Sequence, residues 1–286
     1  MTNKKLALVD IMGGLGNQLH QVNFANYLKE NNYNVLVSTE WYSFKQLDDK
    51  TTKRNLEINI EDFNLIKADE KILKKFDRLN NLIKIQPLKR VYRSRINKFY
   101  KLHKGDVLLD NSKYLNNRYT GYWQDAKYLL DRKNYFIEAL CKNSEFKNNL
   151  NNQSKDVNTV IHIRKGDYIN WGEDLPSNYY LNALQSLRKF EETIKYDIFT
   201  DEQNVDINKK IFKEAENIFN NLNEKPLITL SRMQGYKNFI ISNSSFSFFA
   251  AYLSRSKDKK VLYPNPWFKT VSHVPYTNSD WLEISY

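Results

Sequence analysis

Residues 6–19 read LALVDIMGGLGNQL, and this stretch decides the class of fold. The apolar run from Leu6 to Met12 is typical of a buried strand, and it ends in the two glycines of a tight turn. Apolar residues then recur at helical spacing from Leu15 to Leu28. Residues 34–39, NVLVST, have the composition of a second strand. Strand, helix and strand make a βαβ unit, which predicts an α/β protein with parallel strands.

A second α/β series follows in the C-terminal half. Strands are predicted over residues 159–163, 196–200, 227–230, 239–242 and 260–263. Helices are predicted from the cap Ser177 to Leu187, from Ile207 to Leu222 and from Ser244 to Leu253. This alternation predicts a doubly wound parallel sheet with ligands at the carboxyl ends of its strands. Residues 143–158 are polar and lack periodicity, so we expect an N-terminal domain over 1–150 and a C-terminal domain over 151–286.

The net charge of +11 implies an anionic partner, which could be nucleic acid, an acidic membrane surface or a phosphorylated ligand. Residues 71–104 carry twelve Lys or Arg against the single acid Asp77. Their apolar spacing predicts an insertion of two amphipathic helices separated by Pro87. The basic face of these helices is either a solvated surface or a docking surface for anionic lipid.

A cytoplasmic location, with peripheral binding to the inner face of the plasma membrane, is the expectation for this chain. Residues 1–5 lead directly into the first strand, and no apolar run approaches membrane-spanning length. Cys141 is the only cysteine, which excludes an intramolecular disulfide and a cysteine-based metal site.

Three clusters at predicted strand ends could carry chemistry. In residues 13–18, GGLGNQ, close glycines before a helix suit either a ligand or a purely structural turn. In residues 162–168, HIRKGDY, His162 and Arg164 share one face of a strand. The Arg164 fork suits a diphosphate, and Asp167 could hold that fork. In residues 243–247, NSSFS, hydroxyl groups at a helix start suit phosphate oxygens or simple capping.

Together with residues 121–124, GYWQ, these clusters resemble in order the motifs of the galactoside α-1,2-fucosyltransferases of glycosyltransferase family eleven. The resemblance implies a GT-B fold of two Rossmann-like domains facing across a cleft. It also implies GDP-L-fucose as donor, inversion to an α-linked product, and no metal or other cofactor. The family's His-x-Arg-Arg-x-Asp pattern maps onto residues 162–167 with Lys165 in place of the second Arg. His20 stands where the family has Phe, and Phe248-Phe249 replace its Trp pair.

The motifs and the resemblance together give the candidate site residues, and the resemblance itself assigns Arg164. Arg164 binds the departing diphosphate, Asn17 or Gln18 positions the acceptor hydroxyl, and His20 and Asp167 are the candidate bases. Contacts to the donor are expected from Gly14, Gly16, Gln18, His162, Lys165, Asn243, Ser244, Ser245 and Ser247. The acceptor is expected to be a galactose-terminated oligosaccharide, either free or lipid-linked, in an O-antigen or a similar polysaccharide.

Three alternatives stay open at this point. A related fucosyltransferase could form another linkage, such as α-1,6. A protein of another class could bind NAD through the first βαβ unit, with Glu40 on a ribose. The basic stretch could also bind nucleic acid, although we expect no nucleic-acid partner.

Overall fold

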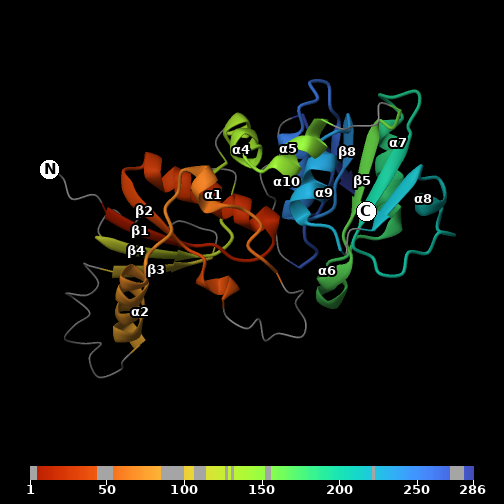
Figure 1. Ribbon diagram of the computed structural model, residues 1–286. Helices are drawn as coiled ribbons and strands as arrows, with labels where there is room; N and C mark the ends of the chain where they lie inside the picture. Colours follow the sequence, from red (N-terminus) through yellow and green to blue (C-terminus); the bar gives the residue numbers. More distant parts are fainter. Residues whose placement is uncertain are drawn as a thin grey trace. The chain divides into compact units, whose positions relative to one another are not determined.

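The computed structural model describes residues 5–43, 54–84, 100–105, 114–125, 128–129, 132–151, 156–220, 223–270 and 280–286 (Figure 1). These residues form two compact units, one of residues up to 129 and the other from 132 onward. The units therefore divide about 20 residues before the expected position. Helices α4 (Lys133–Leu140) and α5 (Ser144–Asn151) belong to the second unit, because they bury Phe136 and Phe146 there.

Unit 1 is built on a parallel sheet of order β2-β1-β4-β3. Its strands are β1 (Lys5–Asp10), β2 (Tyr33–Ser38), β3 (Tyr100–Lys104) and β4 (Asn116–Thr120). Helix α1 (Leu15–Glu30) joins β1 to β2, as the sequence predicts. Phe24 of α1 stacks on Trp123 with 4.2 Å between ring centroids, so the helix and the segment after β4 share one aromatic core. Two short 3₁₀ helices follow β2, over Glu40–Tyr42 and Ile60–Phe63.

The basic stretch contains helix α2 (Glu70–Lys84) and, at its end, strand β3. The helical prediction is thus right for α2 and wrong for residues 100–104, because Tyr100 and His103 are buried where β3 pairs with β4. The second predicted helix and Pro87 lie outside the described residues.

Unit 2 is built on a parallel sheet of order β10-β9-β8-β5-β6-β7. Its strands are β5 (Thr159–Ile163), β6 (Tyr196–Thr200), β7 (Asn217–Asn220), β8 (Asn238–Ile240), β9 (Val261–Asn265) and β10 (Leu282–Ser285). From β5 the chain adds strands first on one side and then on the other, so the sheet is doubly wound and its order reverses between β5 and β8. Each unit is a Rossmann-like α/β domain, which confirms the predicted GT-B class of fold.

Helices connect the strands of unit 2, and the sequence predicts two of them, over 177–187 and 244–253. They are α6 (Gly166–Trp171), α7 (Ser177–Leu187), α8 (Lys210–Lys213), α9 (Pro226–Met233) and α10 (Ser245–Leu253). Pro176, not Ser177, is the residue before the first turn of α7. Tyr179, Leu184 and Leu187 of α7 are buried in the core beneath the sheet. Among the described residues, no helix is long and apolar enough to span a membrane.

Two sequence predictions in unit 2 are wrong. The helix expected over 207–222 is the short α8 followed by edge strand β7, where Phe219 packs on Phe199 with ring centroids 4.8 Å apart. Packing against β6 outweighs the helical spacing there. The strand expected over 227–230 is helix α9, because Pro226 starts a helix and Leu227, Leu230 and Met233 lie on one buried face. Strand β10, which the sequence did not predict, pairs beside β9.

Candidate functional site

The site of unit 2 lies where the strand order of its sheet reverses. Strands β5 and β8 are parallel neighbours, with Ile161 opposite Ile240. Their carboxyl ends therefore emerge side by side and deliver Arg164 from one strand and Ser242 and Asn243 from the other. The two motifs are about 80 residues apart in sequence, and the sheet brings them together.

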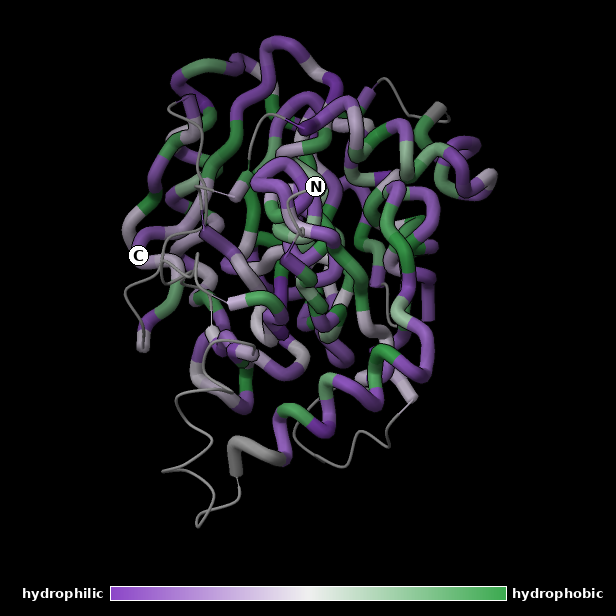
Figure 2. The backbone as a smooth tube through the Cα atoms, turned by 90° about the vertical axis from the view of Figure 1, so that its left-hand side faces the viewer, coloured by the Kyte–Doolittle hydropathy of each residue, from purple (hydrophilic) through white to green (hydrophobic). Residues whose placement is uncertain are grey.

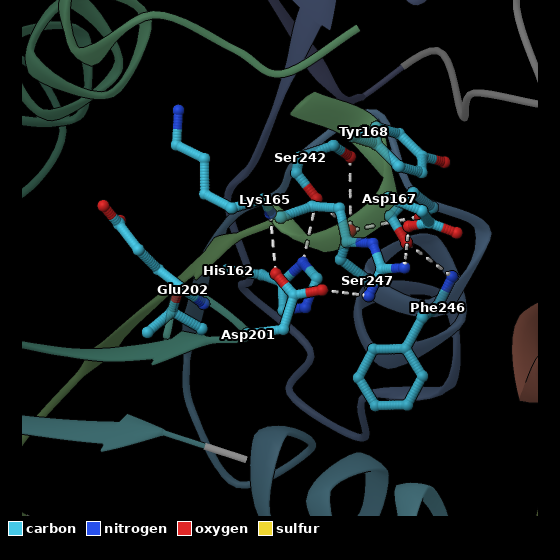
Figure 3. Close-up of polar contacts among 12 residues, drawn as sticks. His162, Lys165, Asp167, Tyr168, Asp201, Glu202, Ser242, Phe246 and Ser247 are labelled. Atoms are coloured by element: carbon cyan, nitrogen blue, oxygen red, sulfur yellow. Dashed lines mark hydrogen bonds and ion pairs between the residues drawn. The ribbon is translucent and has the colours of Figure 1, made fainter. Parts of the chain in front are cut away.

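The guanidinium of Arg164 is held by two carboxylates (Figure 3). Its Nη1 donates to Asp201, and its Nη2 donates to Asp167. Asp201 also accepts from the backbone N–H of Lys165 at 2.6 Å. The Arg164 side chain is 15 % exposed and lies over the Tyr168 ring. The two ion pairs use two of the five N–H groups of the fork, so the remaining three can meet an anion.

Asp201 is a site residue that the sequence analysis missed. It comes directly after β6, and β6 pairs with β5 on the side away from β8. An acid immediately after a fully buried strand is a signal that could have found it.

Gly166 allows Asp201 to come close to Arg164. The residue has φ +26°, and a Cβ placed on it would lie 2.6 Å from Oδ2 of Asp201 and 3.7 Å from Cζ of Arg164. Any other side chain would therefore push the carboxylate away from the fork.

His162 is buried beneath this cluster. Its Nδ1 lies 2.8 Å from Oγ of Ser242, which in turn lies 3.3 Å from Oγ of Ser247. Burial, with the charge of Arg164 as a second cause, lowers the pKa of His162 to about 3. The imidazole is therefore neutral at physiological pH, so Arg164 is the charged member of this pair.

Lys165 extends away from the cluster, as Figure 3 shows. Its ammonium pairs with Asp174 at 2.8 Å and donates to the carbonyl oxygen of Leu175 at 3.2 Å. Although the residue follows Arg164 directly, its side chain stabilises the loop after α6.

The segment 243–247 wraps the start of helix α10. Ser244 caps the helix, and its side chain accepts from the N–H of Phe246 at 3.3 Å. Ser247 donates to the carbonyl oxygens of Ser242 and Ser244. Tyr168 donates to the carbonyl oxygen of Asn243 at 3.2 Å, which joins this segment to the Arg164 motif. Ser245 is the first residue of the helix, whose N–H groups are suited to an anion.

The glycine turn of unit 1 is held by Gln18. The side chain is fully buried, and its amide donates to the carbonyl oxygens of Gly13 and Asn55 at 3.0 and 2.8 Å. Its Oε1 accepts from the N–H of Glu57 at 2.9 Å. Both N–H donors are thus used within unit 1, which gives Gln18 a structural part in shaping the turn.

The other predicted residues of unit 1 lie on the same helix. Gly14 precedes its first turn, Gly16 is buried in that turn, and His20 is 3 % exposed one turn later. Asn17 is half-buried, and its Oδ1 accepts from the amide of Gln124 at 2.7 Å. The motif 121–124 is therefore explained by its contacts with α1.

The structure thus gathers His162, Arg164, Asp167 and residues 243–247 in unit 2, while residues 14–20 form a separate cluster in unit 1. Within the described part of the chain, no group of three or more His, Cys, Asp or Glu could hold a metal ion. Glu40 lies in the 3₁₀ helix after β2, with its carboxylate 3.4 Å from Oγ of Ser38.

A doubly wound domain with an anchored arginine and a helix start at its switch point is typical of proteins that bind a nucleotide through its phosphates. Comparison with known proteins makes the class specific. The chain belongs to Glycosyl transferase family 11, whose sequence profile matches residues 8–281. It is therefore a glycosyltransferase, and the predicted family is confirmed.

Two relatives from Escherichia coli are similar along much of the chain. The O-antigen biosynthesis glycosyltransferase WbnK is 26 % identical, over 96 % of this chain and 99 % of its own. An alpha-1,2-colitosyltransferase is 25 % identical, over 61 % of this chain and 67 % of its own.

Among solved structures, the fucosyltransferase NodZ from Bradyrhizobium is 11 % identical and has a TM-score of 0.48. The match covers 87 % of this chain and 92 % of that one. The Escherichia coli heptosyltransferase WaaC with ADP is 9 % identical and has a TM-score of 0.40. Here 98 % of this chain and 93 % of that one are covered.

Proposed function

We propose that the protein transfers L-fucose from GDP-L-fucose, with inversion, to the 2-hydroxyl of a β-galactoside in an O-antigen or a similar polysaccharide. Family membership supports transfer of a fucose-type sugar. The two relatives are named for O-antigen synthesis and for an α-1,2 linkage, which supports the acceptor class and the position of attack. The single observation that carries the proposal is the Arg164 fork fixed by Asp167 and Asp201 at the switch point.

The proposed reaction needs groups that stabilise the negative charge of the departing GDP. As the bond between the anomeric carbon and the diphosphate oxygen breaks, negative charge grows on GDP and positive charge on the sugar ring. The free N–H groups of Arg164 and the start of α10 stabilise GDP. The neutral His162 and Ser242 form a buried support under this arrangement.

The acceptor hydroxyl forms the new bond to the anomeric carbon as the bond to the diphosphate breaks, and its proton passes to a phosphate oxygen of the departing GDP or to water. Asp167 is already bound to Arg164, and His20 is buried in α1. These placements favour a mechanism in which the bond to the diphosphate breaks before the acceptor hydroxyl loses its proton. A hydroxyl that attacks a sugar cation needs only a weak base. We keep Asn17 as the proposed contact to the acceptor.

Incubation of the purified protein with GDP-L-fucose and a panel of β-galactosides, followed by linkage analysis of the products, tests the proposal. An α-1,2-fucosylated product supports it, and an α-1,6 linkage would refute the proposed position of attack. Arg164→Ala should lose donor hydrolysis and transfer together, whereas Arg188→Ala, an exposed arginine of the same unit, should lose neither. Full activity of Arg164→Ala would refute the role of the fork.

A second donor is favoured by one specific observation. The chain is 25 % identical to an alpha-1,2-colitosyltransferase, and colitose is fucose without the 3-hydroxyl. Comparing kcat/KM for GDP-L-fucose and GDP-colitose decides between them. A site that hydrogen-bonds the 3-hydroxyl should reject colitose strongly, since the polar group left unpaired costs binding energy.

We also propose that no metal takes part, because Arg164 and the helix start offer N–H donors to the phosphate oxygens of the leaving group. Transfer should be unchanged by an excess of EDTA. Loss of activity that Mg²⁺ or Mn²⁺ restores would refute this point.

A further inference from the structure

The positive charge of this protein is concentrated in one segment. The chain has 44 Lys or Arg and 33 Asp or Glu, which gives +11. Residues 71–104 alone contain twelve basic residues and one acid, which also gives +11. The remaining residues are therefore neutral as a whole, and the net charge of the chain equals the charge of this segment.

Helix α2 shows how part of this charge is presented. Lys71, Lys74, Lys75 and Arg78 follow the i, i+3, i+4, i+7 pattern, so they form one stripe along the helix, and all four are exposed. We call these four residues the basic stripe. They extend over about 10 Å of helix axis.

The acids near the stripe are already paired. Glu70 pairs with Lys74 at 2.5 Å, and Asp77 pairs with Arg118 of strand β4 at 2.8 Å. Lys75 donates to Oδ1 of Asn116 at 2.8 Å. Glu70 therefore offsets the charge of Lys74, and the other three stripe residues keep theirs, so the stripe is positive as a whole.

The apolar face of α2 is turned toward the core of unit 1. Phe76 is buried with its ring centroid 5.8 Å from that of Tyr100, and Ile72, Leu73 and Leu79 pack in the same cluster. Hydrophobic and hydrophilic residues alternate along this helix, which lies at the bottom of Figure 2. An amphipathic helix that binds membranes by insertion needs a free apolar face, and α2 has already used its own.

We propose that the basic stripe docks the protein on an anionic lipid bilayer, by electrostatic adsorption without insertion. The four stripe residues lie in one exposed row, so they can face several acidic headgroups at the same time. Proteins that bind single-stranded nucleic acid combine basic residues with exposed aromatic rings for stacking, and none of the described α2 side chains exposes such a ring. This inference does not depend on the proposed donor or acceptor.

Co-sedimentation of the full chain with vesicles tests the proposal. The protein should bind phosphatidylcholine vesicles that contain about 30 % phosphatidylglycerol and should not bind pure phosphatidylcholine. A variant with all four stripe residues changed to Gln should bind at least a hundredfold more weakly, at about fivefold per charge. The matched control changes Lys147, Lys189, Lys213 and Lys257 to Gln, which removes the same charge from exposed positions of unit 2. It should bind as the unchanged protein does.

The outcomes separate the possible partners. Binding should disappear at about 0.5 M salt, where the Debye length is only a few ångströms. Binding that survives this salt would show insertion and overturn the proposal. An equal loss of vesicle binding in the stripe variant and its control would also overturn the proposal. Tight binding to RNA without binding to anionic vesicles would overturn it as well. Unchanged thermal unfolding and donor hydrolysis in both variants show that the fold and the active site are intact.

Discussion

Asp201→Asn is the substitution that best isolates how the Arg164 fork is positioned. The Asp201 carboxylate accepts from Arg164 through Oδ2 and from the N–H of Lys165 through Oδ1. Asparagine is nearly the same size but has a single acceptor oxygen. One of the two contacts therefore becomes an N–H group facing another N–H group.

The magnitude follows from that lost contact. A hydrogen bond to a charged partner contributes about 1.5–3 kcal/mol, and leaving a donor without its acceptor costs a similar amount. If about 2–3 kcal/mol of this interaction free energy contributes to transition-state stabilisation by keeping the Arg164 guanidinium in position, kcat should fall about 30- to 150-fold. The effect should appear in kcat more than in the KM for the donor, because the fork acts most strongly on the charge of the leaving group.

Steady-state kinetics of transfer and of donor hydrolysis provide the measurement, with exposed Asp258→Asn as the control. A double-mutant cycle tests whether Asp201 acts through Arg164. In an Arg164→Lys background, Asp201→Asn should lower kcat little further, because the guanidinium that Asp201 positions is already absent. Activity within about threefold of the unchanged protein would contradict the positioning role. An equal loss in the Arg164→Lys background would contradict it as well.

Other predictions concern single residues whose surroundings are well defined. Gly166→Ala should reduce donor hydrolysis at least about tenfold, because the added Cβ meets Asp201. Gly172→Ala is the matched control: its φ is also positive, but an added Cβ meets no atom within 4 Å, so activity should be kept. Gln18→Ala should lower the free energy of unfolding by about 3 kcal/mol in a urea titration, with exposed Gln185→Ala unchanged; equal stability of the two variants would refute the structural role of Gln18. His162 has a folded pKa near 3 and an ordinary unfolded value of 6.5. The unfolded state therefore binds the extra proton between these values, and stability should fall by up to about 1.4 kcal/mol for each pH unit below 6.5. His162→Gln should remove this part of the slope, and an unchanged slope would show that other groups cause it.

Much of the fold follows from local sequence patterns. Strands β1, β2, β5, β6, β8 and β9 and helices α1, α7 and α10 are predicted with errors of one or two residues at most ends. Their apolar residues repeat with a clear period, and glycine or capping residues mark several of their ends. The family motifs also stand in the printed sequence, so the class of enzyme could be predicted from the order of those motifs.

Errors occur where tertiary packing decides. Residues 217–220 form a strand because β6 offers an edge with Phe199 to pack against, and four residues are too few to show a period. Residues 100–104 are as basic as the helix before them, yet they pair with β4 as a strand. Both depend on pairing with another strand, which a local pattern does not report.

At the site, the sequence by itself determined that an arginine leaves a buried strand beside a glycine, and that a serine-rich turn starts a later helix. Only the tertiary structure decided which groups meet. It placed Asp201 on the Arg164 fork, turned Lys165 toward Asp174, and buried His162 against Ser242. The physical reason is that strand order and register are set by pairing across the whole sheet, whereas periodicity reports only on the face that each residue presents.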